Sequence, residues 1–357
     1  MAKFMLFSDI HVHPHKKSQD RLNDCIKALE WVFEVAKEQK VDAVLFGGDL
    51  LHDRQKIDSL TYNQIFNVLE KQQNENFKTY LLLGNHDLWF ATSHSVSSVR
   101  PFKALKNFEV IDSTQAKTIC GVSWHFIPYT HHPIEELEKL RHEINNSYLL
   151  GHLAIDGAKL NSAGSISDVI IEHDGDMVVI GKDLFHQYKR AFFGHYHSWQ
   201  KLTETIEYIG SPLQLSFGEA GEKKHVIILD SADNSLTYVE NTFSPKHIYV
   251  KDTEISSLTE SDLKNNFVCI LTEESNQFDD KKNMNRVIEE LKASSVQVKK
   301  QNKKADVHAI TDAKLLVADQ DKLLERYVEQ VQNVDLSKEK LLQVGLEIVR
   351  KAQDEKD

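Results

Sequence analysis

Short apolar segments, each followed directly by polar residues, recur along the first ninety positions of the chain. Residues 3–9, 41–49 and 78–87 each read as a buried strand that ends in Asp, Asn or His. Between them, residues 19–40 and about 58–73 carry apolar side chains at the three- and four-residue steps of an amphipathic helix. This alternation predicts βαβ units and a buried parallel sheet. Ligands of such sheets bind beyond the carboxyl ends of the strands, where these polar residues fall.

After this part the pattern becomes rich in short strands. The candidate strands cover residues 109–112, 117–121, 122–128, 147–152, 176–181, 189–195, 206–210 and 225–230. Many short strands after βαβ units predict a second sheet that packs on the first, with helices outside. The expected fold class is therefore α/β.

The pattern changes again near residue 243. Strands are expected at residues 247–251, 267–272 and 296–300, with a helix around 283–293, which together predict a small α/β module. From about residue 312 the chain is predicted to be largely helical. We therefore divide the chain into three parts, which are residues 1–242, 243–310 and 311–357.

Composition places the chain among ordinary globular proteins, with 41% hydrophobic and 27% charged residues in 357. The net charge of −11, from 43 basic and 54 acidic side chains, argues against extensive non-specific binding of nucleic acid. It does not exclude a nuclease, because bound cations or a basic partner would offset it. Three scattered cysteines favour a reducing, cytoplasmic setting. No signal peptide and no membrane span is expected.

Five polar clusters follow the apolar runs. They are SDIH (8–11), GGDLLH (47–52), GNHD (84–87), GHLAIDG (151–157) and GHYH (194–197). Each cluster alone is weak evidence, because an Asp at the end of a strand is more often a helix cap or a turn residue. Five such clusters, each behind a strand, favour a metal site.

The residue types fit a pair of ions. Asp9 and His11 lie two positions apart, so in an extended segment they project to one side and can share an ion. The carboxylate of Asp49 has enough lone pairs to bridge two ions. The other candidate ligands are Asn85, His152, His195 and His197. A mixed oxygen and nitrogen set without thiolate suits Mn²⁺, Fe²⁺ or Zn²⁺ better than Ca²⁺ or Mg²⁺ alone.

These motifs resemble the calcineurin-like metallophosphoesterase superfamily. Within it, the segments FFGHYHSWQKL, IEYIGSPLQLSFGE (206–219) and KKHVIILD (223–230) resemble the SbcD-like nucleases of double-strand-break repair and their phage relatives. The resemblance covers about residues 1–242. It implies a four-layer αββα sandwich with two Mn²⁺ ions per chain, or Mg²⁺, Fe²⁺ or Zn²⁺ in their place.

The same resemblance implies roles for individual residues. The first ion would be held by Asp9, His11, Asp49 and His197. The second ion would be held by Asp49, Asn85, His152 and His195. His86 would not bind metal but would face the scissile phosphate, with His52 as a second substrate-facing histidine. Asp87 is expected to brace the loop.

By this resemblance, the chain is a Mn²⁺-dependent DNA nuclease that acts as a 3′→5′ exonuclease and a structure-dependent endonuclease. Residues 243–310 would form a capping domain that positions DNA. Residues 311–357 would dock on the coiled coil of an SMC-like ATPase, although a helix packed on its own domain explains their apolar stripe equally well. A homodimer within a heterotetramer is implied, with a helical region after GNHD contributing to it.

Two rival functions stay open. A phosphodiesterase for nucleotides or other small molecules would share the ligand set, and a scaffold protein for the ATPase would need only the fold. Simple interpretations also apply to several residues outside the ligand set. His13 and His15 are read as a solvated loop, and Trp89 and Phe90 as core. Residues 299–304 are read as a solvated loop, with contact to DNA phosphates as the alternative.

Overall fold

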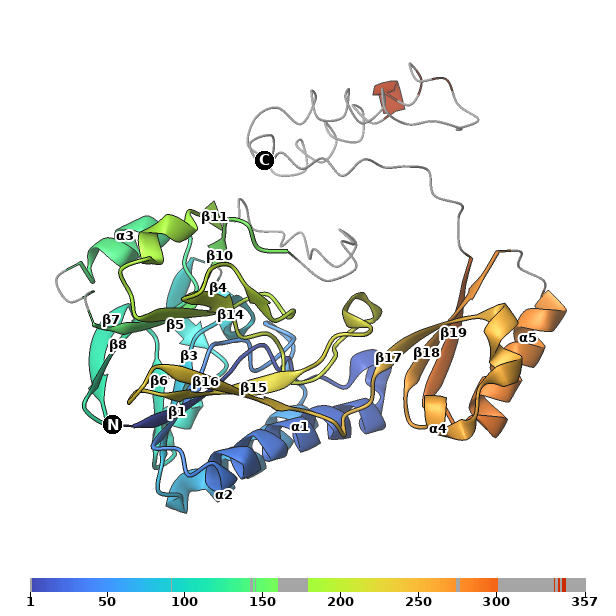
Figure 1. Cartoon of the computed structure of the whole chain (residues 1–357), viewed down its shortest axis with the longest axis horizontal. Coiled ribbons are helices and arrows are strands. Elements are labelled where there is room, and N and C mark those ends of the chain that lie inside the picture. The colour runs from blue at the N-terminus through green and yellow to red at the C-terminus, as the bar shows by residue number, and fades with distance from the viewer. Residues whose placement is uncertain are drawn as a thin grey trace. The chain divides into compact units, whose positions relative to one another are not determined.

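The computed structural model (Figure 1) describes residues 2–90, 92–141, 144, 146–159, 179–273, 277–300, 337, 340 and 342–344. The chain divides into two compact units, Met1–Lys299 and Lys300–Asp357. Of the predicted docking segment 311–357, the structure describes only residues 337, 340 and 342–344. Most of the basic segment 299–304 also lies outside the described residues.

The first unit contains a six-stranded mixed sheet. In spatial order its strands are β16 (Ser235–Glu240), β15 (His225–Asp230), β1 (Lys3–Phe7), β2 (Ala43–Phe46), β3 (Lys78–Leu82) and β6 (Phe108–Ile111). The last four run parallel, as the repeated strand–helix pattern predicts. The antiparallel strand β15 pairs with β1 from more than two hundred positions away in the sequence.

The second sheet also has six strands and is also mixed. Its strands, in spatial order, are β13 (Gln200–Lys201), β14 (Ile206–Tyr208), β12 (Arg190–Gly194), β9 (Tyr148–His152), β8 (Val122–Ile127) and β7 (Gln115–Ile119). The inner four are parallel, and the two edge strands are antiparallel.

The two sheets pack face to face. Alternation along β1 sends Phe4 and Leu6 into the layer between the sheets, and Met5 and Phe7 to the opposite face. The second sheet fills this layer mainly with aromatic side chains, of which Trp124 lies 5.2 Å from Phe4 between ring centroids. Burial of these large apolar groups is the main stabilising contribution of the sandwich.

Helices α1 (Gln19–Glu38) and α2 (Ser59–Lys71) cover the outer face of the first sheet (Figure 1). Each begins after a capping side chain, because Ser18 accepts a hydrogen bond from the backbone N–H of Arg21, and Asp58 from that of Thr61. The outer face of the second sheet is covered by shorter elements, α3 (Pro133–Glu138) and a 3₁₀ turn at Lys182–Phe185. The α/β class and the packed sheets are confirmed.

A separate three-stranded sheet follows, with strands β17 (His247–Lys251), β18 (Phe267–Thr272) and β19 (Ser295–Lys300). Helices α4 (Glu260–Leu263) and α5 (Gln277–Asn285), with a π-turn at Arg286–Glu290, pack on it around a small apolar core. Arg21 of α1 donates a hydrogen bond to the carbonyl of Gln214 and lies 5.0 Å from the ring centre of Phe267. The expected strands are present, and the assignment of residues 243–310 to a separate capping domain stays a prediction.

Every candidate strand predicted from the sequence has a counterpart, although only Val179–Ile180 of 176–181, strand β11, is described. It pairs with β10 (Ala154–Ile155). The segment after GNHD differs from the expected helical region, because it forms a hairpin of β4 (Leu88–Phe90) and β5 (Ser93–Ser97) before a 3₁₀ turn. Among the described residues, no helix combines the length and apolar character needed to cross a membrane.

Candidate metal centre

The predicted ligands come from the carboxyl ends of five parallel strands in the two sheets. Asp9 and His11 follow β1, Asp49 follows β2, Asn85 follows β3, His152 ends β9, and His195 and His197 follow β12. Because parallel strands point their carboxyl ends to one edge, and the sheets are stacked, these side chains meet. The structure therefore brings all seven predicted ligands together.

Asp49 lies at the centre of this group. One oxygen, Oδ2, is 3.3 Å from His152 Nε2 and 3.5 Å from His11 Nε2. The other, Oδ1, accepts a hydrogen bond of 2.8 Å from the backbone N–H of His86. The carboxylate is buried, and its Oδ2 lies near a nitrogen from each of the two predicted ligand sets.

The candidate donor atoms form two overlapping groups around Asp9 and Asp49. Donor atoms of Asp9, His11 and His197 fall within 4.8 Å of one another, and those of Asp9, Asp49 and His152 do the same. Asp9 thus belongs to both groups, whereas the sequence-based assignment gave it to the first ion alone. Asn85 Oδ1 lies 2.9 Å from His152 Nε2 and 3.2 Å from His195 Nδ1.

The backbone around these ligands is strained. Asp9, His11, Asp49 and His195 have positive φ angles of 53°, 45°, 62° and 99°. Non-glycine residues rarely adopt this region, and each such residue costs on the order of 1–3 kcal/mol. Four instances among seven candidate ligands indicate that the site, rather than the stability of the fold, requires these conformations.

Two glycines allow the strand ends to approach each other. A Cβ atom on Gly84 would lie 2.1 Å from Asp49 Oδ1, and one on Gly194 would lie 2.2 Å from the hydroxyl of Ser8. Either position would displace the central carboxylate or the β1 loop if it carried a side chain. The glycines of GNHD and GHYH therefore serve close packing at the site.

Neighbouring groups hold the ligands in place. Asp87 accepts hydrogen bonds from the backbone N–H groups of Asp49, Leu50 and Gly84, which confirms the expected bracing contacts. His152 Nδ1 lies 2.7 Å from the carbonyl of Gly47, so Nδ1 is the donor and Nε2 faces the site.

The electrostatics of the pocket favour positive charge near Asp49. Burial opposes ionisation of Asp49, but His152 and His86 hold the pKa of this carboxyl well below its usual range. Burial lowers the pKa of His152, but Asp49 raises it by more, to about 9. Burial lowers the pKa of His195 to about 3 and that of His11 well below its ordinary value. A cation between these groups would replace the proton on His152.

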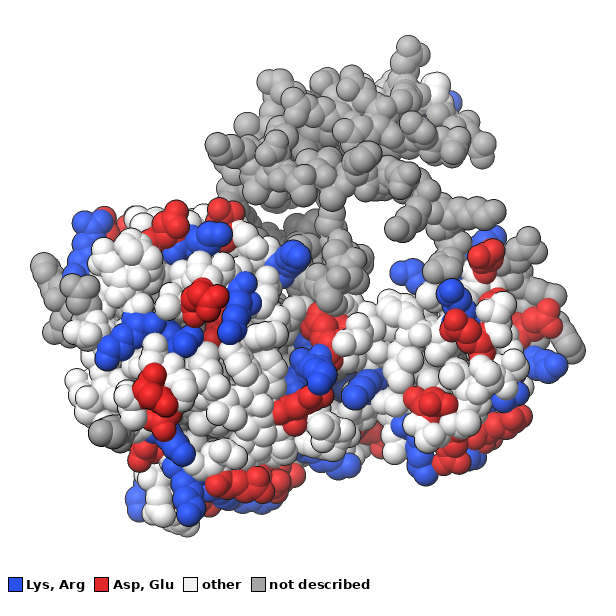
Figure 2. Space-filling view, in the orientation of Figure 1, with Lys and Arg blue, Asp and Glu red and all other residues white. Residues whose placement is uncertain are grey.

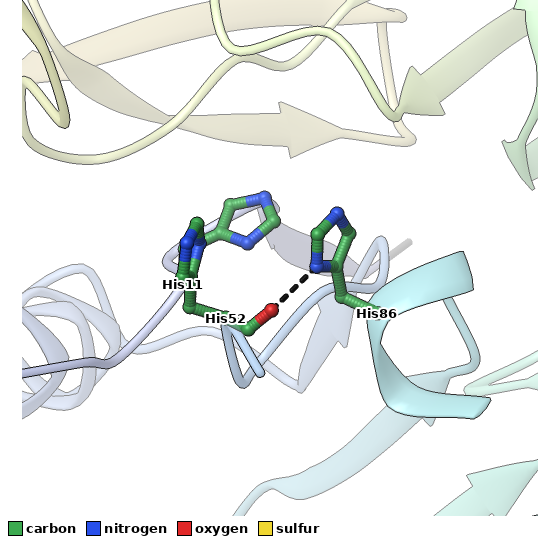
Figure 3. Close-up of side chains that lie close together, drawn as sticks. All are labelled: His11, His52 and His86. Atoms are coloured by element: carbon green, nitrogen blue, oxygen red, sulfur yellow. Dashed lines mark hydrogen bonds between the residues drawn. The ribbon is translucent and has the colours of Figure 1, made fainter. Parts of the chain in front are cut away.

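His86 and His52 lie beside the first set of donors (Figure 3). Their donor atoms and those of His11 fall within 4.8 Å, and the ring centroids of His11 and His86 are 4.7 Å apart. His86 Nδ1 lies 2.5 Å from the carbonyl oxygen of His52, as the dashed line in Figure 3 marks. This contact makes Nδ1 a donor and turns the ring's other nitrogen away from His52.

The loop that carries His13 and His15 corrects a sequence-based expectation. Both residues are half-buried rather than fully solvated, and their ring centroids lie 5.0 and 5.3 Å from that of His52. Burial lowers the pKa of His52 to about 4, and the nearby His86 contributes.

Two features of the site had no place in the ligand prediction. The ring of Tyr129 lies 6.3 Å from that of His152 and 6.1 Å from that of His195. The carboxylate of Glu219 contacts Nδ1 of His197. Glu219 lies in the GSPLQLSFGE segment, which the sequence analysis singled out without giving this residue a role. No apolar or polar periodicity marks either residue as part of a site.

The donor chemistry suits transition metals. The pocket offers carboxylate oxygens, an amide oxygen and imidazole nitrogens, and His11 Nε2 and His197 Nε2 face each other at 3.0 Å. Nitrogens of two imidazoles at this distance are well placed to share one ion. The residues present therefore fit a pair of divalent ions.

Comparison with known proteins places this site in a family. The model of the calcineurin-like phosphoesterases matches residues 2–199. A viral protein named as a phosphoesterase, 244L of Invertebrate iridescent virus 6, is 25% identical over 199 residues, which cover 53% of this chain and 64% of that protein. The chain thus spans less than two thirds of this relative.

The chain is also similar to a bacterial nuclease subunit and to a solved phosphatase structure. The SbcD component of the nuclease SbcCD from Escherichia coli is 24% identical over 278 residues, covering 67% of both chains. A dimetal phosphatase from Danio rerio has a TM-score of 0.40 and 8% identity, covering 64% of this chain and 91% of that one. Since the family model matches more than half of its residues, the chain belongs to the calcineurin-like phosphoesterase family.

Proposed function

We propose that this metal-dependent phosphoesterase is a DNA nuclease, with 3′→5′ exonuclease and structure-dependent endonuclease activity supported by Mn²⁺. The observation that carries the proposal is the position of Asp49, whose Oδ2 lies 3.5 Å from His11 Nε2 and 3.3 Å from His152 Nε2. A carboxylate between two sets of donors is what a two-ion phosphodiester site requires.

In this proposal each ion has its own ligands and shares Asp49. The first ion is held by Asp9, His11, Asp49 and His197, and the second by Asp49, Asn85, His152 and His195. When bound, such a pair supplies Lewis-acid stabilisation of a phosphate and lowers the pKa of a water near it. The protein's contribution is to fix the ligands, through the strained backbone and the contacts of Asp87 described above.

His86 is assigned to the leaving group. Its Nδ1–H donates to the carbonyl of His52, so the proposal assigns Nε2 to the substrate. In the imidazolium form, which carries a proton on each nitrogen, the Nε2 proton would pass to the leaving 3′-oxygen and the Nδ1 proton would stay. General acid catalysis of this kind contributes about 10²- to 10⁴-fold in other enzymes. His52, whose ring centroid lies 5.7 Å from that of His86, is assigned to substrate contact.

DNA as the substrate is supported by the resemblance of residues 191–230 to SbcD-like nucleases and by the similarity to the Escherichia coli SbcD protein. In the view of Figure 2, basic and acidic side chains are interspersed over the described residues, without a continuous basic surface. We therefore propose that an SMC-like coiled-coil ATPase supplies much of the DNA affinity. In this scheme residues 243–310 position the DNA, residues 311–357 dock on the partner, and two copies form a heterotetramer with it.

A small-molecule phosphodiesterase is the second candidate, because the chain is about as similar to a viral phosphoesterase, whose name specifies no DNA substrate, as it is to SbcD. Full-length protein would be assayed with Mn²⁺ on end-labelled duplex DNA, a DNA hairpin and a chromogenic diester. The DNA proposal expects cleavage of both DNA substrates that is lost in His86→Ala. Efficient hydrolysis of the diester with intact DNA would support the second candidate. Binding of a coiled-coil ATPase without cleavage of any substrate would indicate a scaffold.

A further inference from the structure

Glu219 contacts the imidazole of His197. It lies on a segment to which the proposed reaction assigns no other residue. It ends a 3₁₀ turn at Phe217–Glu219, where Ser216 accepts a hydrogen bond from the backbone N–H of Gly218. Its side chain is buried, and Oε1 lies 3.1 Å from His197 Nδ1. A buried carboxylate needs strong partners to stay charged.

The partners of Glu219 are divided between its two oxygens. Oε2 lies 2.6 Å from the ammonium of Lys224, 3.2 Å from the backbone N–H of Leu215 and 3.3 Å from the hydroxyl of Ser211. Oε1 has His197 as its partner. The carboxylate is thus held in place through one oxygen and presents the other to the imidazole.

The same segment also holds the backbone of His197. The carbonyl of His197 accepts hydrogen bonds of 2.9 Å from the backbone N–H of Ser211 and from the ammonium of Lys224. Gly210 makes this approach feasible, because it has a φ of 75° and a Cβ there would lie 2.9 Å from the His197 carbonyl oxygen. Side chain and backbone of His197 are therefore fixed by residues 210–224.

These contacts determine which nitrogen of His197 is available. A neutral imidazole has one N–H, and a carboxylate acceptor places it on Nδ1. Nε2 then directs its lone pair toward His11 Nε2, 3.0 Å away, and toward Asp9. Histidines that bind metals commonly donate their other N–H to a carboxylate in this manner.

We propose that Glu219 is a positioning residue, which fixes the tautomer and the ring orientation of His197 so that Nε2 can bind the first ion. Lys224, 2.6 Å from Oε2, holds the Glu219 carboxylate in place. This inference rests on the proposed role of His197 as a metal ligand.

The test compares Glu219→Gln with a matched control, Glu222→Gln, in the full chain. Glu222 also contacts Lys224, at 2.9 Å, and the hydroxyl of Ser198, but the carboxylate that accepts the hydrogen bond from His197 Nδ1 is that of Glu219. Titration of metal-free protein with Mn²⁺ by calorimetry should show one of two sites weakened about 10- to 100-fold in Glu219→Gln. The control should bind both ions as the unaltered protein does.

A second measurement uses the unaltered, metal-free protein. Nitrogen NMR of labelled histidine, assigned with His197→Ala, should show the proton of His197 on Nδ1. A proton on Nε2 with a bare Nδ1 would overturn the inference even if Glu219→Gln failed to fold. Unchanged binding of both ions in a folded Glu219→Gln would also overturn it. If His197→Ala itself retained both ions, the ligand assignment of the proposed function would be wrong instead.

Discussion

Replacement of Asp49 by asparagine tests whether two ions share this side chain, and it changes the shape of the side chain little. The amide can still accept the hydrogen bond from the His86 backbone, so the metal-free fold should be retained. It removes the charge that lies 3.3 Å from His152 and 3.5 Å from His11, and thus the ligand that both ions would share. Both ions should therefore be lost together.

The expected rise in melting temperature follows from the thermodynamic linkage between metal binding and folding. An ion present at a hundred times its dissociation constant stabilises the folded protein by about 2.7 kcal/mol, so two ions contribute about 5 kcal/mol. At roughly 2–4 °C per kcal/mol, the unaltered protein should melt about 10–20 °C higher with Mn²⁺ than without it. Asp49→Asn should show almost none of this increase.

The assay is thermal unfolding of chelator-treated protein with increasing Mn²⁺. Asp156→Asn is the matched control, because it makes the same change at an exposed residue of the neighbouring GHLAIDG segment. The control should keep the full increase in melting temperature. An Asp49→Asn protein that retained the full increase, or about half of it, would refute the bridging role, since half would mean that only one ion depends on Asp49.

Three further results are expected. His86→Ala should keep both ions, counted by metal analysis, and lose about 10²- to 10⁴-fold in DNA cleavage; loss of metal would contradict its assigned role. His195→Ala and His197→Ala should each remove a different ion, so crystals of the two variants that lack the same ion would disprove the assignment. Because the pKa of His152 is raised to about 9, metal-free protein carries this proton at neutral pH. Mn²⁺ binding should therefore release it, and affinity should rise as the pH approaches 9; calorimetry in buffers of different ionisation enthalpy measures this release, and its absence would argue against His152 as a ligand.

The positions of the candidate ligands could be predicted because their signal is local. Each of Asp9, Asp49, Asn85, His152 and His195 stands at or just after the end of an apolar run, and parallel strands carry their ends to one edge of a sheet. The strand positions and this rule were enough to predict that the side chains meet.

Features that depend on distant contacts could not be predicted in the same way. Trp89 and Phe90 read as core, yet they are 45% and 50% exposed on the β4–β5 hairpin. The sequence gives no local reason for an apolar pair to face outward. The link between Glu219 and His197 spans 22 residues and depends on the turn at Gly210, so neither spacing nor periodicity reveals it.

The pairing of β15 with β1 is a further case. Both segments are apolar and predict strands, but their pairing brings residues 225–230 to the N-terminal strand across most of the domain. Strand partners of this kind are determined by how the whole sheet buries its faces, which a local pattern does not contain.

The most direct measurement is a crystal structure of the protein soaked in Mn²⁺, with the anomalous peaks located at the strand ends. Two peaks about 3.5–4 Å apart are expected, one on each side of the Asp49 carboxylate. His11 and His197 should bind one ion, and His152 and His195 the other. A single peak, or two ions that do not share Asp49, would contradict the account.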